Sequence, residues 1–199
     1  MAVAPTRIWA EETDEEDAAL TARASDDPDA LAALYRRHVA AIYRFCERRL
    51  GNRQAAEDAT SAVFLKAIRG LPTFHPGLGS FRGWLFGIAH RTVIDAYRAA
   101  RPAAPLEAAG EVVDHRPGHA PETMALHAEA AREVRAILLG LSESQRAVVE
   151  LRLAGLNGPE IAAVLGRSTG SVKLLQFRAY GRLRALLGAD ADQEDRHVP

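Results

Sequence analysis

The residues best suited to chemistry lie in 157–187, where a short helical pattern, a glycine turn and a longer basic helical pattern follow one another. In the second pattern Lys173, Gln176 and Arg178 lie off the apolar stripe. Lysine and arginine can donate hydrogen bonds to guanine, and glutamine can pair with adenine. Ser171 lies in the first helical turn, where backbone N–H groups attract a phosphate. This pattern is typical of a helix-turn-helix that reads the major groove of DNA.

Two apolar side chains of the same helix, Leu174 and Phe177, also lie off the stripe. Either residue could touch a thymine methyl group in the major groove. Either could instead pack against another helix of the same bundle. The sequence leaves both interpretations open.

Local signals set the ends of the helices that must position these side chains. Asn157 with Glu160 predicts a capping box, as does Ser142 with Gln145 in the helix before it. Gly166 predicts the turn, and a serine after it caps the last helix. The inward stripe of that last helix is Val172, Leu175, Ala179, Leu183 and Leu186.

The whole chain of 199 residues lacks apolar runs of period two, so it is expected to be all-α. Two helical blocks are predicted, at 25–101 and 122–187. The segment 102–121, with four prolines and no periodicity, is predicted to be a flexible linker. An acidic extension at 1–24 is expected to be largely disordered, and an acidic tail occupies 188–199.

The formal net charge of −1 conceals a strong segregation of charge. In chain order, the extension, first block, linker region (102–126), second block (127–187) and tail carry −4, +5, −3, +4 and −3. Basic helical blocks are where a polyanion would dock, although solvated helix faces would give the same count. The acidic extension could also fold onto a basic block and weaken DNA binding.

The first block contains three predicted helices with clear boundaries. Asp27 and Pro28 begin the first, Gly51 ends it, and Asn52 caps the second. After a proline- and glycine-rich loop, Ser80 opens the third. The third helix is apolar on more than one face, which indicates a second packing partner or deep burial.

Several classes of function are not expected. Cys46 is the only cysteine, so an intramolecular disulfide and a cysteine zinc cluster are excluded. His115 and His119 lie four apart, but proline and glycine between them argue against a helical metal site. No nucleophile–base pair or phosphate-binding glycine loop is evident. We therefore expect no enzyme, catalytic residue, metal or cofactor. Without a membrane span or signal peptide, a cytoplasmic protein is expected.

The order of both blocks resembles the extracytoplasmic-function (ECF) sigma factors of bacterial RNA polymerase. The first block is similar to sigma region two, through AEDATSAVFLKAI and GSFRGWLFGIAHRTVIDAYR. The second is similar to sigma region four, through LSESQRAVVELRLAGLNGPEIAAVLGRSTGSVKLLQFRAYGRLRALL. The resemblance implies a protein that binds core polymerase, recognises promoters and helps to melt them, and that is inhibited by an anti-sigma factor.

The resemblance implies three groups of site residues. The helix that grips the β′ clamp coiled coil of polymerase would carry Glu57, Asp58, Phe64 and Lys66. The minus-ten loop and the helix after it would contact DNA through Phe74, His75, Ser80, Phe81, Arg82, Arg91 and Arg98. The minus-thirty-five helix would use Ser171, Lys173, Leu174, Gln176, Phe177 and Arg178. Ser61 and Ala62 stand where many members have Gln-Glu, so one acidic contact with polymerase is missing.

Region four would also touch the β-flap of polymerase through its apolar inner groove. Two other classes of function compete with a sigma factor. A stand-alone helix-turn-helix regulator would dimerise on a palindromic operator, but neither block offers an evident dimer heptad. A helical adaptor that binds no DNA would be indifferent to the loss of Lys173 or Arg178.

Overall fold

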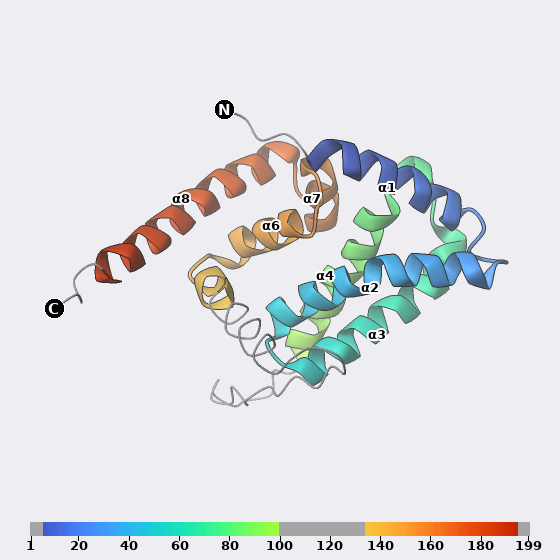
Figure 1. The fold of residues 1–199 in the computed structure, drawn as a ribbon, viewed down its shortest axis with the longest axis horizontal. Helices are drawn as coiled ribbons and strands as arrows, with labels where there is room; N and C mark the ends of the chain where they lie inside the picture. Colours follow the sequence, from blue (N-terminus) through green and yellow to red (C-terminus); the bar gives the residue numbers. More distant parts are fainter. Residues whose placement is uncertain (1–5, 100–133, 195–199) are drawn as a thin grey trace.

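The computed structural model describes residues 6–99 and 134–194, and the regular elements in these ranges are all helical (Figure 1). The predicted all-α fold is therefore confirmed. The predicted linker, the His115 and His119 pair and residues 122–133 of the next predicted helix lie outside the described residues.

Within residues 6–99, the extension and the first block together form four α-helices and two short 3-10 turns. The α-helices are α1 (Thr6–Thr21), α2 (Pro28–Leu50), α3 (Arg53–Gly70) and α4 (Phe81–Ala99). The loop between α3 and α4 contains the 3-10 turns η1 (Leu71–Thr73) and η2 (Pro76–Leu78). Helices α2, α3 and α4 pack against one another, and α1 lies across α2 and α4 (Figure 1).

In the second block, residues 134–139 form a short helical stretch, which three further helices follow. These are α6 (Glu143–Leu153), α7 (Gly158–Leu165) and α8 (Thr169–Glu194). Helix α8 continues beyond the predicted end near Leu187 into the acidic tail, and its C-terminal end projects away from the other helices (Figure 1).

The predicted caps are confirmed. They could be predicted because each depends only on residues close to it in the sequence. Asp27 accepts hydrogen bonds from the backbone N–H groups of Asp29 and Ala30. Gly51 ends α2 in the left-handed region at φ 67°, which glycine adopts without steric cost. Both expected capping boxes form, one at Ser142 and one at Asn157.

One hydrophobic core runs through both blocks. Its fully buried side chains include Phe45 and Phe86 from the first block and Leu151 and Ile161 from the second. Helix α7 packs along α4, so α4 has α2 and α3 on one side and α7 on the other (Figure 1). This contact explains the apolar excess on α4, because the second face of that helix is covered by the second block.

The acidic extension differs from its prediction, because residues 6–21 form the helix α1. Asp17 is buried and accepts a 3.0 Å hydrogen bond from Arg37, while its other oxygen lies 2.7 Å from His38 Nε2. Glu16 pairs with the same arginine at 2.6 Å. The extension lacks a large apolar face, which suggested disorder. In the structure, ion pairs between α1 and α2 hold it in place instead.

Candidate nucleic-acid interface

The helix-turn-helix is formed by α7 and α8. Gly166 makes the turn at φ 61°, and the Ser168 hydroxyl accepts from the backbone N–H of Ser171 at 3.2 Å, as a cap should. Val172 and Ala179 on α8 are buried, as the inward stripe predicts. Helix α8 packs against both α6 and α7, which fixes the face that it turns to solvent.

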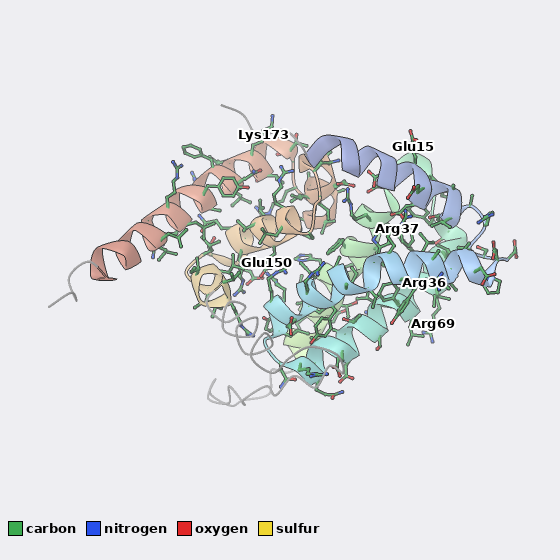
Figure 2. All side chains as sticks on the ribbon, viewed as in Figure 1. Glu15, Arg36, Arg37, Arg69, Glu150 and Lys173 are labelled. Carbon is green, nitrogen blue, oxygen red and sulfur yellow. The ribbon has the colours of Figure 1, made fainter. Side chains whose placement is uncertain are left out.

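The outward face of α8 combines cations with uncovered apolar side chains. Lys173 and Arg178 are exposed, and Lys173 projects from the helix near its N-terminal end (Figure 2). Leu174 is 50% exposed and Phe177 is 71% exposed. Of the two interpretations of these apolar residues, packing within the bundle is therefore wrong for the part of the chain that the structure describes.

Gln176 is held in place by two neighbours. Its amide oxygen accepts a 3.2 Å hydrogen bond from Arg152 on α6, and its amide nitrogen donates to Tyr180 at 3.1 Å. Arg152 also donates to the carbonyl of Leu156. These bonds fix the orientation of the Gln176 amide and leave one N–H and one oxygen lone pair for a base, whereas Lys173 and Arg178 are fully on the exposed face.

The loop before α4 is anchored by a cluster of aromatic rings. Phe74 packs on Phe81 and Trp84, with ring centroids 5.8 and 5.0 Å apart. His38 of α2 lies against Phe81 at 5.4 Å. Phe81 is buried and Phe74 is partly buried, so these rings support the loop from below, while His75 is exposed.

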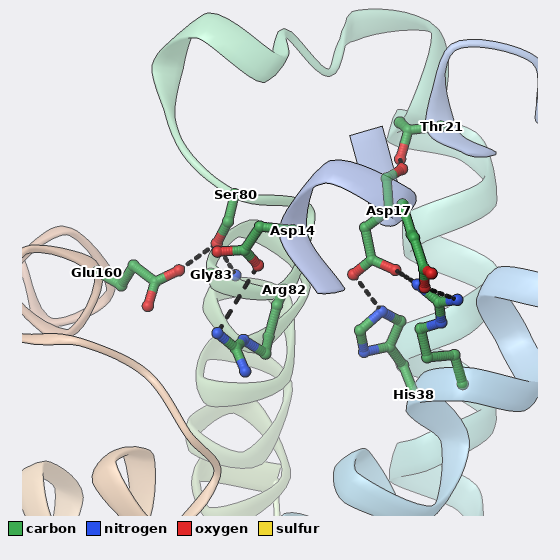
Figure 3. Close-up of polar contacts among 10 residues, drawn as sticks. Asp14, Asp17, Thr21, His38, Ser80, Arg82, Gly83 and Glu160 are labelled. Atoms are coloured by element: carbon green, nitrogen blue, oxygen red, sulfur yellow. Dashed lines mark hydrogen bonds and ion pairs between the residues drawn. The ribbon is translucent and has the colours of Figure 1, made fainter. Parts of the chain in front are cut away.

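The N-terminal end of α4 is covered by acidic side chains from two directions (Figure 3). Ser80 caps α4 through the N–H of Gly83 at 3.0 Å and donates to Glu160 of α7. Arg82 faces Asp14 of α1 at 3.7 Å, and only 15% of its side chain is exposed. Burial raises the pKa of Asp14 and the nearby Arg82 opposes that rise.

The candidate minus-ten residues therefore fall into two groups. Phe74, Ser80, Phe81 and Arg82 are gathered at one end of α4, whereas Arg91 and Arg98 are exposed further along the helix. Because an α-helix rises 1.5 Å per residue, Arg98 lies roughly 24 Å along the axis from Arg82. The helix could follow a strand of phosphates but does not form one compact pocket.

The candidate polymerase-facing residues lie along α3. Asp58 is exposed and accepts from Gln54 at 3.0 Å, and Glu57 pairs with Arg53 at 2.8 Å. Lys66 donates to Thr92 of α4 at 3.1 Å. Phe64 is buried and meets the edge of the Tyr35 ring, so it supports this surface from behind and does not lie on it.

Three charged residues escaped the sequence analysis. Arg49, at the end of α2, bonds Glu150 of α6 at 3.2 Å and also donates to Glu143. Arg49 and Glu150 are among the most completely buried side chains of the described residues. The available signal was Glu150 itself, a charge within the apolar stretch Val148–Leu151 of α6.

Burial and neighbouring charges shift the pKa values at this contact. Burial raises the pKa of the Glu150 carboxyl even though Arg49 favours its ionised form. Partial burial works against ionisation of Glu143, but Arg49 and Arg146 together lower its pKa. Burial, with the help of Arg49, lowers the pKa of His90 on α4 to about 4, so that this imidazole is neutral at pH 7.

Two family models match the chain in the order that the sequence predicts. Sigma-70 region 2 matches residues 34–102, and Sigma-70 region 4 matches residues 131–183. The chain is also 32% identical over 183 residues to the ECF RNA polymerase sigma factor SigD of Mycobacterium tuberculosis. That match covers 88% of this chain and 85% of SigD.

The chain belongs to the ECF sigma factors. A second relative, BldN of Streptomyces coelicolor, is 34% identical over 167 residues, which cover 83% of this chain and 63% of BldN. Among solved structures, CnrH in complex with the cytosolic domain of CnrY matches with a TM-score of 0.69 and 30% identity. That comparison covers 88% of this sigma factor and 99% of CnrH.

Sigma factors are initiation factors of transcription, and their region four binds DNA. Within residues 6–99 and 134–194, no group of histidine, cysteine, aspartate or glutamate side chains is arranged to hold a metal ion. In the same ranges, no helix has both the length and the apolar character needed to cross a membrane.

Proposed function

We propose that residues 25–101 bind core RNA polymerase and the minus-ten element, while residues 122–187 read the minus-thirty-five element. The chain itself is not an enzyme in this scheme; it supplies polymerase with promoter specificity and works in the cytoplasm. The observation that carries the proposal is the pairing of two matched sigma regions with an exposed, cationic and apolar face on α8.

The minus-thirty-five element is read by the outward face of α8. Lys173 and Arg178 supply donors for phosphates or guanine, and Leu174 and Phe177 supply apolar contacts for thymine methyl groups. Exposure of Phe177 is costly in a free protein, and contact with DNA offsets that cost. Ser171 lies at the N-terminal turn of α8, where a phosphate is favoured. Gln176 joins them through the amide N–H and the oxygen lone pair that its present bonds leave available.

The minus-ten element is bound by the loop 74–80 and by α4. Phe74 and Phe81 build the aromatic support for a base flipped out of the duplex. His75 offers an edge hydrogen bond, and Ser80 offers another once its hydroxyl is released from Glu160. Arg82, Arg91 and Arg98 lie along α4, where they neutralise the phosphates of the melted strand.

Polymerase is held at two places. The acidic Glu57 and Asp58, with Lys66 further along α3, face the β′ clamp coiled coil, and Phe64 stiffens α3 from below. The β-flap fits an apolar groove of about 260 Å³ between residues 134–139, α6 and α8. Its lining is Val134, Ile137, Leu138, Val149, Arg152, Leu153, Tyr180 and Leu183.

An anti-sigma factor holds the protein inactive by covering these polymerase-facing surfaces. The support is the similarity to CnrH, which was solved with the cytosolic domain of CnrY bound to it. Uncovered apolar side chains on α3, such as Leu65 and Ile68, give such an inhibitor area to bury.

In vitro transcription tests the proposed function. Purified protein is added to sigma-free core polymerase with a genomic library, and the 5′ ends of the transcripts are mapped. We expect transcripts that share sequence elements near positions −10 and −35, and at least tenfold fewer of them for the double variant K173A and R178A. A protein that neither joins the polymerase nor directs transcripts would overturn the proposal.

A matched variant controls for loss of positive charge alone. Arg182 and Arg184 are exposed on α8 beyond the candidate reading residues, so the double variant is compared with the double variant R182A and R184A, which removes the same charge. Unchanged transcription by this control and a large loss for K173A and R178A would localise the contact. Equal losses would show that charge, and not position on α8, determines activity.

A further inference from the structure

Helix α1 lies outside both stretches that the sigma-70 models match, which are residues 34–102 and 131–183. It nevertheless packs on both α2 and α4 (Figure 1). Asp14 of α1 faces Arg82 in the first turn of α4 at 3.7 Å. Helix α1 therefore touches the minus-ten end of α4, although neither matched region includes it.

The attachment of α1 to α2 centres on a buried carboxylate. Only 1% of the Asp17 side chain and 4% of the His38 side chain are exposed. Asp17 Oδ2 lies 2.7 Å from His38 Nε2, and Oδ1 accepts a 3.0 Å hydrogen bond from Arg37 (Figure 3). A carboxylate removed from water is strongly unfavourable unless opposite charge and hydrogen bonds accompany it. These two bonds therefore hold α1 at one place on α2.

The bond to Asp17 also fixes the His38 imidazole. Because a carboxylate only accepts hydrogen bonds, Nε2 is the nitrogen that donates. One side of the imidazole is attached to the backbone of α2 and the other is bonded to α1, so the ring cannot turn freely about its Cβ–Cγ bond. Asp17 thus sets both the protonated nitrogen and the tilt of the ring.

The fixed imidazole lies against the aromatic cluster of the minus-ten loop. Its centroid is 5.4 Å from that of Phe81, with 56° between the two ring planes. Phe81 meets Phe74 edge-on at 5.8 Å, and Trp84 lies 5.6 Å from Phe81 and 5.0 Å from Phe74. Aromatic rings at these separations prefer particular mutual angles, so a turn of one ring displaces the next. A continuous line of contacts runs from Asp17 on α1 to Phe74 in the loop.

Capture of a flipped base requires rings that are in place before the base arrives. Unstacking a base from the duplex is unfavourable, and stacking on protein rings offsets that cost. Such a site depends on side chains behind it, which lock the rotamers of those that make the contact. Asp17 and His38 are both buried, so they act on a base only through the rings above them.

We propose that Asp17 and His38 are positioning residues of the minus-ten site. They hold Phe81, and through it Phe74, in the orientation that receives the flipped base, and α1 is thereby a part of that site. The proposal rests on the proposed function, because the aromatic cluster must support a flipped base for its orientation to matter. Variants on α1 should then alter recognition of a base that α1 does not touch.

Removal of single bases measures this positioning. Holoenzyme is formed from core polymerase and the full-length chain, and its affinity is measured for a promoter found as above. The non-template strand is left unpaired across the minus-ten element, and each base of the element is replaced in turn by an abasic site. The replacement that weakens wild-type binding most marks the flipped position. We expect a loss of about tenfold there, which stacking of one base on protein rings can supply.

The variant D17N keeps the shape of the side chain and removes its charge. It should bind the intact promoter more weakly and the abasic promoter like the wild type, so that the loss on base removal falls to about threefold. The control E16Q makes the same change one position away, on a carboxylate that pairs with Arg37 and is 65% exposed, and it should keep the full loss. H38Q can still donate to Asp17 but has no ring to place on Phe81, so it should resemble D17N and provides the test if D17N folds poorly.

A role in stability alone would lower the affinity for intact and abasic promoters together. Equal weakening of both affinities, in either variant that joins core polymerase, would therefore overturn the proposal, as would an unchanged loss on base removal. A wild type that shows no base dependence at any position of the element would instead overturn the flipped-base part of the proposed function. The two failures are distinguishable, because the first is seen only in the variants.

Discussion

The two candidate DNA-reading surfaces of this protein differ in what covers them. On α8, Lys173, Phe177 and Arg178 face outward. At the start of α4, Ser80 and Arg82 are occupied by carboxylates of the chain itself. Positive charge alone therefore does not make a DNA-binding surface, because its availability depends on how the neighbouring helices are arranged.

The difference arises from the number of partners that each helix has. Helix α4 packs on α2 and α3 with one face and on α7 with another, and it contacts α1 as well. Helix α8 packs only on α6 and α7 among the more extensive helix contacts of the described residues. A helix enclosed on several sides gives up solvent access for stability, whereas α8 keeps one face for an external ligand.

Truncating one aromatic ring at each surface gives the largest contrast. Phe81 is 6% exposed beneath the minus-ten loop, and its loss in F81A removes contacts with Phe74, Trp84 and His38. We predict a fall of about 3 kcal/mol in the free energy of unfolding, the range for a buried phenylalanine. Phe177 is 71% exposed, so F177A should change stability by less than about 0.5 kcal/mol.

Urea denaturation followed by circular dichroism measures both values. If the exposed ring of Phe177 contacts DNA as proposed, F177A should still lose affinity for a minus-thirty-five duplex. Equal stability losses in the two variants would show that Phe177 packs against the protein and that the contrast between the surfaces is wrong.

The two acidic partners of Arg49 allow a second, slightly smaller contrast. In E150Q the buried Arg49 loses the charge of its fully buried partner, and we predict that the free energy of unfolding falls by about 3 kcal/mol. In E143Q the loss should be below about 1 kcal/mol, because the Glu143 side chain is 63% exposed and its charge is screened by water.

Small-angle scattering of the free protein reports the outcome directly. E150Q should show a larger radius of gyration than the wild type, and E143Q should not. If both variants keep the compact profile and the wild-type denaturation midpoint, then the ion pair does not hold the regions together.

The pH dependence of stability tests the contact around Arg49 through His90, a residue of α4 that lies beside it. Burial lowers the pKa of His90 to about 4, whereas in the unfolded chain it titrates near 6.5. The unfolded state therefore binds more protons between these values, and stability should fall by about 3 kcal/mol as the pH drops from 7 to 4. The groups facing His90 include Arg49 on α2, Glu143 on α6 and Arg91 on α4.

The variant H90Q isolates this contribution, because every other titrating group is shared with the wild type. The raised pKa of Glu150 acts with the opposite sign, since it favours the folded state at low pH. The difference between wild type and H90Q, measured by urea denaturation from pH 4 to 7, should grow with pH. A difference that does not change with pH would show that burial does not lower the pKa of His90.

Much of the fold could be predicted because its signals are local. The capping box of Asn157 with Glu160, the stop at Gly51 and the inward stripe of α8 each depend on residues within a few turns. The exposed character of Lys173 and Arg178 followed from the same helical periodicity. These predictions needed no knowledge of what lies across the molecule.

Contacts between distant residues were beyond the sequence. Arg49 and Glu150 are 101 positions apart, and helical periodicity cannot show that they meet. The apolar excess on α4 indicated a second partner, but only the structure shows that this partner is α7. The acidic composition of the extension suggested disorder. The residues that hold it in place, Arg37 and His38, lie about 20 positions away in the sequence and so could not be recognised as its partners.

The smallest expected effect concerns a single phosphate contact on the uncovered surface. If Lys173 meets a phosphate, K173A should bind a minus-thirty-five duplex only a few-fold more weakly at moderate salt. Its plot of log affinity against log salt should be shallower by about 1, because one fewer counterion is released. Lys66, the other lysine of the chain, lies on α3 near Asp95, so K66A should leave both values unchanged. A weaker affinity with an unchanged slope would assign Lys173 to a base edge, and α8 would then read sequence at its first turn.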